Sequence, residues 1–217
     1  SSTNIIKLKE LMVYKNLFNR IFFSIIFFGI YFISLNNQYL LFIFGTFIYL
    51  IVFYEVFKFF KNFFKLIFLY LFLSYFSFTL YFFVFFNYKI FNFFVFTIIL
   101  FDSFSYFIGK FFGKNYIFKF LSPKKTLEGY LGGIFFTNLS LLCFFYFINY
   151  EKNIIFLITL INLTIFISSI GDLIESYFKR QNNIKDSSKL IPGHGGYFDR
   201  FDSFIASIIM LCLLSLL

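Results

Sequence analysis

The chain has no tryptophan, one alanine, one histidine, two prolines and two cysteines among its 217 residues. Cys143 and Cys212 lie in apolar runs, so they provide neither a disulfide framework nor a metal-ligand spacing. A single histidine excludes a histidine-rich metal cluster. Charged residues are also scarce, at 13% of the chain, whereas 60% of the residues are hydrophobic. Soluble domains carry roughly 25% charged and about 45–50% apolar residues, so an ordinary soluble domain and a disordered chain are both excluded.

Phenylalanine and tyrosine are abundant, with 45 and 16 residues. Phe, Ile, Tyr, Asn and Lys all have A/T-rich codons, which indicates an A+T-rich genome. Much of the phenylalanine then fills generic apolar positions. Aromatic stripes therefore carry little information about function in this chain.

Long apolar runs predict membrane-spanning helices. A bilayer core of ~30 Å requires about 20 apolar residues per helix, and open strands would leave backbone groups unpaired in lipid. Seven runs fit this requirement: 20–35, 39–57, 66–86, 90–112, 130–150, 154–178 and 203–217. We therefore expect an all-α fold, a polytopic integral membrane helical bundle of about seven transmembrane helices. The first run follows a basic arm without a small-residue cleavage site, which favours a retained signal-anchor.

The net charge of +9 is unevenly distributed between the predicted loops. With a cytoplasmic N-terminus, 17 of the 19 basic residues fall on one side, and only Lys89 and Lys152 fall on the other. The positive-inside rule makes the basic side cytoplasmic. Because the bases sit in short clusters between apolar runs, we expect membrane lipids, and no nucleic acid, as partners.

Residue types suited to turns and to chemistry collect in the second half of the chain. Nine of the 11 glycines, both prolines and His194 lie between residues 109 and 196. We therefore divide the chain into N-terminal transmembrane helices, 1–89, and a catalytic transmembrane region, 90–217. The catalytic region contains two predicted cytoplasmic loops, 110–129 and 179–200.

Acids and bases at the ends of two predicted helices indicate a metal–phosphate site. Asp172, Glu175 and Lys179 share one helical face, and Asp199 and Asp202 repeat the i, i+3 spacing at the start of the last span. Paired carboxylates suit Mg²⁺, and the glycine-rich turn between the helices can bring backbone N–H groups to phosphate oxygens. A solvated loop with balanced charges is the alternative. The cost of roughly 2.5–3.5 kcal/mol for an intramembrane ionisable group favours a functional site.

Asp102 makes a similar case in the predicted fourth span. It shares a helical face with Gly109 and Gly113, so this face either packs closely against another helix or carries an acid that lines a polar cavity. In the loop that follows, adjacent Lys124 and Lys125 suit either a polyphosphate or lipid headgroups.

The segment Ser176–Asp202 reads SYFKRQNNIKDSSKLIPGHGGYFDRFD. Its spacing of Lys-Arg, Lys-Asp, His-Gly-Gly and Asp-Arg-x-Asp resembles the signature of the phosphatidate cytidylyltransferase (CDP-diacylglycerol synthase) family. Segments 102–113, 122–133 and 171–176 are also similar to that family, and Glu55 is a weaker point of resemblance.

The resemblance implies the reaction of CTP with phosphatidate to give CDP-diacylglycerol and diphosphate. It also implies an Mg²⁺ cofactor, a monovalent cation such as K⁺, and a homodimer. The expected location is the bacterial inner (cell) membrane, with the active site facing the cytoplasm.

Motif and chemistry together predict three groups of site residues. The catalytic group is Asp186, Asp199, Lys179, Arg180 and His194. The substrate-binding group is Lys124, Lys125, Ser122, Glu128, Asp102, Lys185, Gly195, Gly196 and Arg200. The metal group is Asp172, Asp186, Asp199 and Asp202.

Two other functions use similar ingredients. A CTP-dependent polyprenol or lipid kinase would transfer the γ-phosphate, and a small ion-coupled transporter would use intramembrane acids to carry ions. Ion pathways seldom need a glycine- and base-rich phosphate loop, which argues against transport. His194 is either a general base or part of the loop architecture.

Overall fold

The computed structural model describes residues 22, 25–35, 37–118, 120–147, 154–191 and 195–216. After a short apolar helix, Ile25–Ser34, the elements are α2 (Gln38–Phe59), α3 (Phe64–Leu80), the π-helical η1 (Tyr81–Phe85), α4 (Tyr88–Phe112), β1 (Tyr116–Phe118), β2 (Ser122–Thr126), α5 (Leu127–Phe147), α6 (Ile154–Gln181) and α7 (Phe198–Leu216). The expected all-α membrane bundle is confirmed, with one small β-hairpin added to it.

Five helices in the described part of the chain are long and apolar enough to cross a membrane. They are Gln38–Phe59, Phe64–Phe85, Tyr88–Phe112, Leu127–Tyr146 and Ile154–Gln181. Only 22–39% of the most apolar stretch of each helix is buried inside the protein. Their outward faces are therefore apolar too, as contact with lipid requires.

The first and last predicted spans differ from these five helices. The first, 20–35, is described in part, as the ten-residue helix Ile25–Ser34. The last begins at Phe198 rather than at residue 203, and Asp199, Arg200 and Asp202 make its first turns polar.

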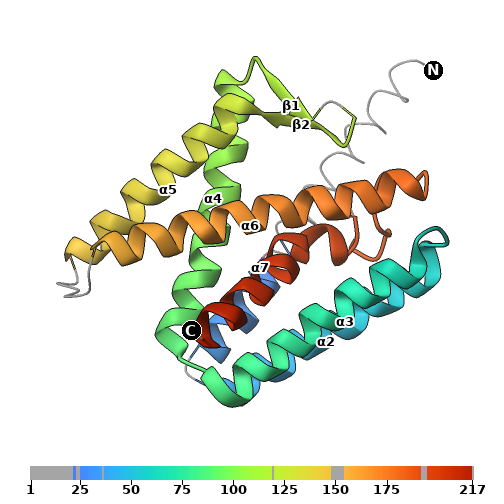
Figure 1. Ribbon diagram of the computed structural model, residues 1–217, viewed down its shortest axis with the longest axis horizontal. Helices are drawn as coiled ribbons and strands as arrows, with labels where there is room; N and C mark the ends of the chain where they lie inside the picture. Colours follow the sequence, from blue (N-terminus) through green and yellow to red (C-terminus); the bar gives the residue numbers. More distant parts are fainter. Residues whose placement is uncertain are drawn as a thin grey trace.

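Asparagine side chains begin two of the long helices. Asn37 Oδ1 accepts hydrogen bonds from the N–H groups of Tyr39 and Leu40, and Asn87 Oδ1 accepts from those of Lys89 and Ile90. Each bond satisfies an N–H group that has no partner within the helix. These caps fix where α2 and α4 start at the end of the molecule away from the hairpin (Figure 1).

Both connections expected to be loops are shorter than 110–129 and 179–200. In the first, β1 pairs antiparallel with β2, with Tyr116 opposite Thr126 and Phe118 opposite Ser122. In the second, α6 continues through Gln181, so Lys179 and Arg180 are helical residues. The chain leaves α6 at Asn183, whose φ of 54° is left-handed.

The helices form two pairs with α6 and α7 between them (Figure 1). α4 packs along α5, α2 along α3, and α7 contacts both α6 and α3. A Cβ atom at Gly129 would lie 2.7 Å from the Ser105 carbonyl oxygen and 2.9 Å from Gly109 Cα. The close approach of α4 and α5 therefore requires glycine at position 129. The Gly109 face thus packs closely against α5, which was one of the two alternatives left open for it.

The larger apolar cluster joins α2, α3, η1, α4 and α7 around buried side chains such as Val52, Ile67 and Phe94. It encloses one neutral polar relay. The Tyr49 hydroxyl lies 2.5 Å from Ser74 Oγ, and Ser74 Oγ donates to the carbonyl oxygen of Ile205 at 2.6 Å. This relay connects α2, α3 and α7.

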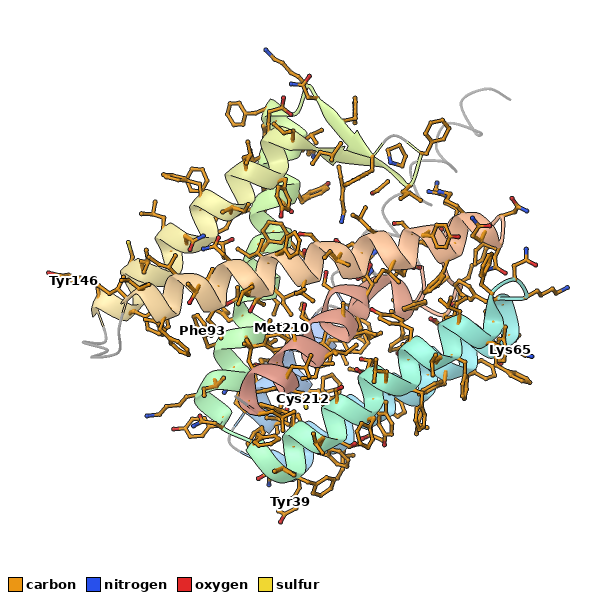
Figure 2. All side chains as sticks on the ribbon, in the orientation of Figure 1. Tyr39, Lys65, Phe93, Tyr146, Met210 and Cys212 are labelled. Atoms are coloured by element: carbon orange, nitrogen blue, oxygen red, sulfur yellow. The ribbon has the colours of Figure 1, made fainter. Side chains whose placement is uncertain are left out.

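The α2–α3 turn is tied to the end of α6 by side-chain hydrogen bonds. Asn182 Oδ1 accepts from the N–H groups of Lys61 and Asn62, both at 2.7 Å. Asn62 Nδ2 donates to the carbonyl oxygen of Gln181 at 2.8 Å, and Asn182 Nδ2 donates to that of Asn62 at 3.1 Å. Figure 2 shows Lys65 near this end of the α2–α3 pair and Tyr39 at the opposite end.

Candidate active site

The site is centred on the last turns of α6 and the first turn of α7. Lys179 Nζ lies 2.5 Å from Glu175 Oε2 on the same helix and 2.8 Å from Asp199 Oδ1 on α7. The side chains of all three residues are at most 13% exposed. The predicted acidic and basic face of α6 is therefore present, and Lys179 connects it to α7.

Asp199 also holds the segment that joins the two helices. Its Oδ2 accepts from the N–H of Ser187 at 2.8 Å, from Ser187 Oγ at 3.0 Å and from the N–H of Gly196 at 2.8 Å. Burial alone would raise the pKa of the Asp199 carboxyl. The charge and hydrogen bond of Lys179 and the backbone N–H of Gly196 outweigh it and hold that pKa below its ordinary value.

Asp172 connects the hairpin with α6 and α7. Lys125 Nζ on β2 lies 2.5 Å from Asp172 Oδ2, and Ser203 Oγ on α7 donates to Asp172 Oδ1 at 2.5 Å. This ion pair is more open than the one at Lys179, since 36% of the Lys125 side chain is exposed. The basic hairpin therefore reaches the same acidic face as α7 does.

Two further acids lie beside Asp172. Asp102 on α4 is close enough to Asp172, Lys125 and Ser203 to interact with them. Asp202 on α7 interacts with Asp172, Glu175 and Asp102, and its Oδ1 accepts from the N–H of Ser203 at 2.9 Å. Carboxylates from α4, α6 and α7 thus lie close enough to interact, and Asp102 itself is exposed.

This group of acids fits a divalent cation by its chemistry. The ion pairs that described residues make with its five carboxylates come from Lys125 and Lys179, so negative charge is in excess. Glu175 Oε1 is buried without a hydrogen-bond partner. Carboxylate oxygens are the hard ligands that Mg²⁺ prefers. Among the described residues, however, no three Asp, Glu, His or Cys side chains are already gathered as a metal site.

Several predicted residues lie in the connecting segment. Lys185 and Asp186 are exposed there. Asp186 Cβ lies 3.4 Å from the position that a Cβ at Gly195 would take, so Asp186 is next to the turn that faces Asp199. Gly195 has a left-handed φ of 87° and accepts from the N–H of Ile191 at 3.0 Å. Its neighbour Gly196 donates to Asp199.

The remaining predicted residues lie at other positions in the fold. Arg180 is exposed and donates to the carbonyl oxygen of Ile184 at 3.5 Å, and Arg200 is an exposed residue of α7. Ser122 begins β2. His194 and the side chain of Lys124 lie outside the residues that the structure describes.

Glu128 anchors the hairpin. Its carboxylate accepts from the N–H groups of Lys114 and Asn115 and from Asn115 Nδ2, at 2.8–3.1 Å. These bonds join the start of α5 to the segment that leaves α4. In the structure, Glu128 therefore holds the backbone that presents Lys125.

Residues that sequence reasoning did not place in the site are Ser187, Ser188, Ser203 and Glu55. Glu55 lies on α2, is fully buried and accepts hydrogen bonds from the segment before α7. Burial and the Glu55 carboxylate raise the pKa of Tyr197, which lies beside it. The available signal was an isolated acid in an apolar run, which in a membrane protein indicates function.

Comparison with known proteins agrees with the chemistry of this site. A family model described as "Cytidylyltransferase family" matches residues 3–217. Proteins named phosphatidate cytidylyltransferase are similar to part of the chain: 41% identity over 97 residues in Staphylococcus aureus, 42% over 98 in Staphylococcus haemolyticus and 44% over 98 in Staphylococcus epidermidis. Each match covers 45% of this chain and 37% of the relative's length.

Proposed function

Because the chain belongs to the cytidylyltransferase family, we propose that it transfers the cytidylyl group of CTP to phosphatidate, forming CDP-diacylglycerol and diphosphate. The observation that carries this proposal is the arrangement of Lys125 and Lys179 among acids from three helices. Matched relatives named phosphatidate cytidylyltransferase support the choice of lipid substrate.

The reaction needs no protein nucleophile. A phosphate oxygen of phosphatidate attacks the α-phosphorus of CTP and forms a new P–O bond. The bond between the α-phosphorus and the oxygen that bridges to the β-phosphate breaks, and its electron pair leaves on diphosphate. The protein must therefore bring two polyanions together and stabilise charge on the leaving group.

The two lysines retain donors for this task. An ammonium group has three N–H donors. Lys179 uses two of them on Glu175 and Asp199, and Lys125 uses one on Asp172. Their remaining N–H groups are available for charge-assisted hydrogen bonds to phosphate oxygens. The carboxylates fix where these donors lie.

We further propose Mg²⁺ as the cofactor, bound by Asp172, Asp199 and Asp202 together with Asp186, and a monovalent cation such as K⁺ alongside it. The excess of carboxylates over lysines supports this assignment. Mg²⁺ would supply positive charge that stabilises the departing diphosphate.

The position of the label in CTP tests the reaction. Purified protein in neutral detergent micelles receives phosphatidate, Mg²⁺ and CTP labelled at either the α- or the γ-phosphate. Cytidylyl transfer places the α-label in lipid and the γ-label in diphosphate. γ-Label in lipid would instead identify a kinase, and a lipid fraction without either label would rule out cytidylyl transfer to phosphatidate.

We also propose that the chain works as a homodimer in the bacterial inner membrane, with this site facing the cytoplasm. The 17 basic residues grouped on one predicted side support the orientation. In a Cys143→Ser, Cys212→Ser background, cysteines at exposed Lys114 and Lys189 should resist an impermeant thiol reagent in intact cells. A cysteine at exposed Lys89 is the matched control and should react. Labelling at Lys114 or Lys189 from outside would overturn the orientation.

A further inference from the structure

Glu55 is a charged side chain buried without a cation. It lies on α2 with none of its surface exposed, and among the described residues it makes no ion pair. A buried carboxylate is costly unless hydrogen bonds satisfy its oxygens. The partners of Glu55 therefore indicate why it is retained.

Four donors surround the Glu55 carboxylate: three belong to the segment between α6 and α7, and the fourth is the N–H of the first residue of α7. Oε1 accepts from Ser188 Oγ at 2.6 Å and from the N–H of Tyr197 at 2.8 Å. Oε2 accepts from the N–H of Phe198 at 2.9 Å and from Ser187 Oγ at 3.3 Å. Two donors come from the beginning of the segment and two from its junction with α7. Glu55 thus holds both ends of the segment to α2.

The fit around the carboxylate is close. A Cβ atom at Gly196 would lie 2.7 Å from both oxygens of Glu55 and 2.0 Å from Ser187 Oγ. Only glycine fits at position 196 without moving the carboxylate. The N–H groups at the start of α7 also offer the partial positive charge of a helix N-terminus to this anion.

The same segment is held from its other side by Asp199. Ser187 donates from Oγ to both Asp199 and Glu55, and Gly196, in contact with Glu55, donates its N–H to Asp199. The segment therefore lies between two carboxylates. Asp199 forms an ion pair with Lys179, whereas Glu55 forms none with a described residue.

We infer that Glu55 is a positioning residue, which fixes residues 187, 188 and 196–198 so that Asp186 and Asp199 are held for metal and phosphate binding. The inference rests on the proposed function, since it assigns Glu55 a role in the same site. Partners that orient metal ligands affect metal affinity or activity roughly 10- to 100-fold.

Glu55→Gln tests this role because an amide nitrogen cannot accept a hydrogen bond, so two donors lose their partner. We expect the Mg²⁺ concentration for half-maximal CDP-diacylglycerol synthesis to rise roughly 10- to 100-fold. A purely structural role would lower the amount of folded enzyme and leave that concentration unchanged. Ser188→Ala, which removes one donor, is the milder second variant if Glu55→Gln fails to fold.

Tyr49→Phe is the matched control. Tyr49 is also buried on α2, but its hydroxyl bonds Ser74 on α3 rather than the segment that Glu55 holds. Its variant should keep the parent's dependence on Mg²⁺.

Amide hydrogen exchange of the metal-free proteins tests the role of Glu55 independently of enzyme activity. The amide of Tyr197 or of Phe198, whichever faces the new side-chain nitrogen, should exchange about tenfold faster in Glu55→Gln than in Tyr49→Phe, because its acceptor is lost. Equal exchange, or an Mg²⁺ dependence like the parent's, would overturn the role of Glu55. A parent protein that makes no CDP-diacylglycerol refutes the proposed function instead, and the exchange rates still decide whether Glu55 holds the segment.

Discussion

Two polar groups buried along α7 differ in kind. Near its middle, the Tyr49–Ser74 relay ends on the Ile205 carbonyl and contains only neutral partners. In its first turn, Asp199 belongs to a charged group with Lys179, where Glu175 Oε1 has no hydrogen-bond partner. The neutral relay is complete within the protein, whereas the charged group leaves an acceptor to be satisfied.

The difference indicates that the neutral relay stabilises helix packing, whereas the charged group serves the reaction. Neutral hydroxyl groups join helices at little cost when each finds a partner. Buried ion pairs cost desolvation that their attraction often fails to recover. Acids and lysines retained at the α6–α7 junction are therefore expected to serve a substrate, and the relay to serve the fold.

Of these variants, Lys179→Gln should reduce CDP-diacylglycerol synthesis the most, because it disrupts the charged group. It leaves Glu175 and Asp199 without a cation, and breaking a buried pair costs about 3–5 kcal/mol. Loss of one charge-assisted bond to phosphate, worth roughly 1.5–3 kcal/mol, corresponds to about a 10- to 150-fold lower kcat/KM. Initial rates and unfolding temperature in neutral detergent micelles measure both effects.

Arg180→Gln is the stability control for this variant. Arg180 is adjacent and exposed, and it bonds a backbone carbonyl, so its variant should keep the parent unfolding temperature. A Lys179→Gln enzyme with the parent's kcat/KM would remove Lys179 from the proposed mechanism.

Lys125→Gln should have a smaller effect. Its ion pair with Asp172 is partly exposed, and such pairs contribute about 0.2–1 kcal/mol to stability. Loss of a phosphate contact at the low end of 1.5–3 kcal/mol predicts roughly a tenfold lower kcat/KM for CTP. Lys114→Gln, an exposed position before the same hairpin, should not show this loss. Equal kinetics of the two variants in neutral micelles would mean that Lys125 serves only anionic lipid.

Ser74→Ala should leave synthesis per folded molecule unchanged. It removes the partner of the buried Tyr49 hydroxyl, which costs about 1–3 kcal/mol of stability. Denaturant unfolding followed by rate measurements on the folded fraction tests both parts. A changed kcat/KM in the folded fraction would show that the relay is not confined to the fold.

Local sequence patterns predicted the parts of the site that lie within one helix. The spacing of Asp172, Glu175 and Lys179 predicted their shared face, and Asp199 was expected at the start of the last helix. Glu55, Ser187 and Ser203, which make contacts between distant parts of the chain, were not predicted as site residues. Glu55 meets Ser187 across 132 positions, and Ser203 meets Asp172 across 31. Such contacts depend on how helices pack, which residue spacing along one helix does not determine.

The hairpin and the helix ends show a second limit. β1 and β2 have three and five residues, and β2 contains Pro123, so the segment lacks the alternation that predicts strands. Glu128 was expected to bind substrate, and it lies in the segment 122–133 that resembles the family. The backbone N–H groups that occupy its carboxylate come from residues 114 and 115, whose position depends on the end of α4.

The bonds between Asn182 and the α2–α3 turn bear on the order of assembly. They join residues 120 and 121 positions apart, and chains are synthesised from the N-terminus. The turn between the first two long helices therefore waits, with two backbone N–H groups unpaired by this partner, until α6 has been made. Lys179 and Asp199 come together around the same stage, so the charged centre cannot form before α6 and the start of α7 have been made. A nascent chain halted before α6 would thus be a set of apolar helices without the chemistry of the finished molecule.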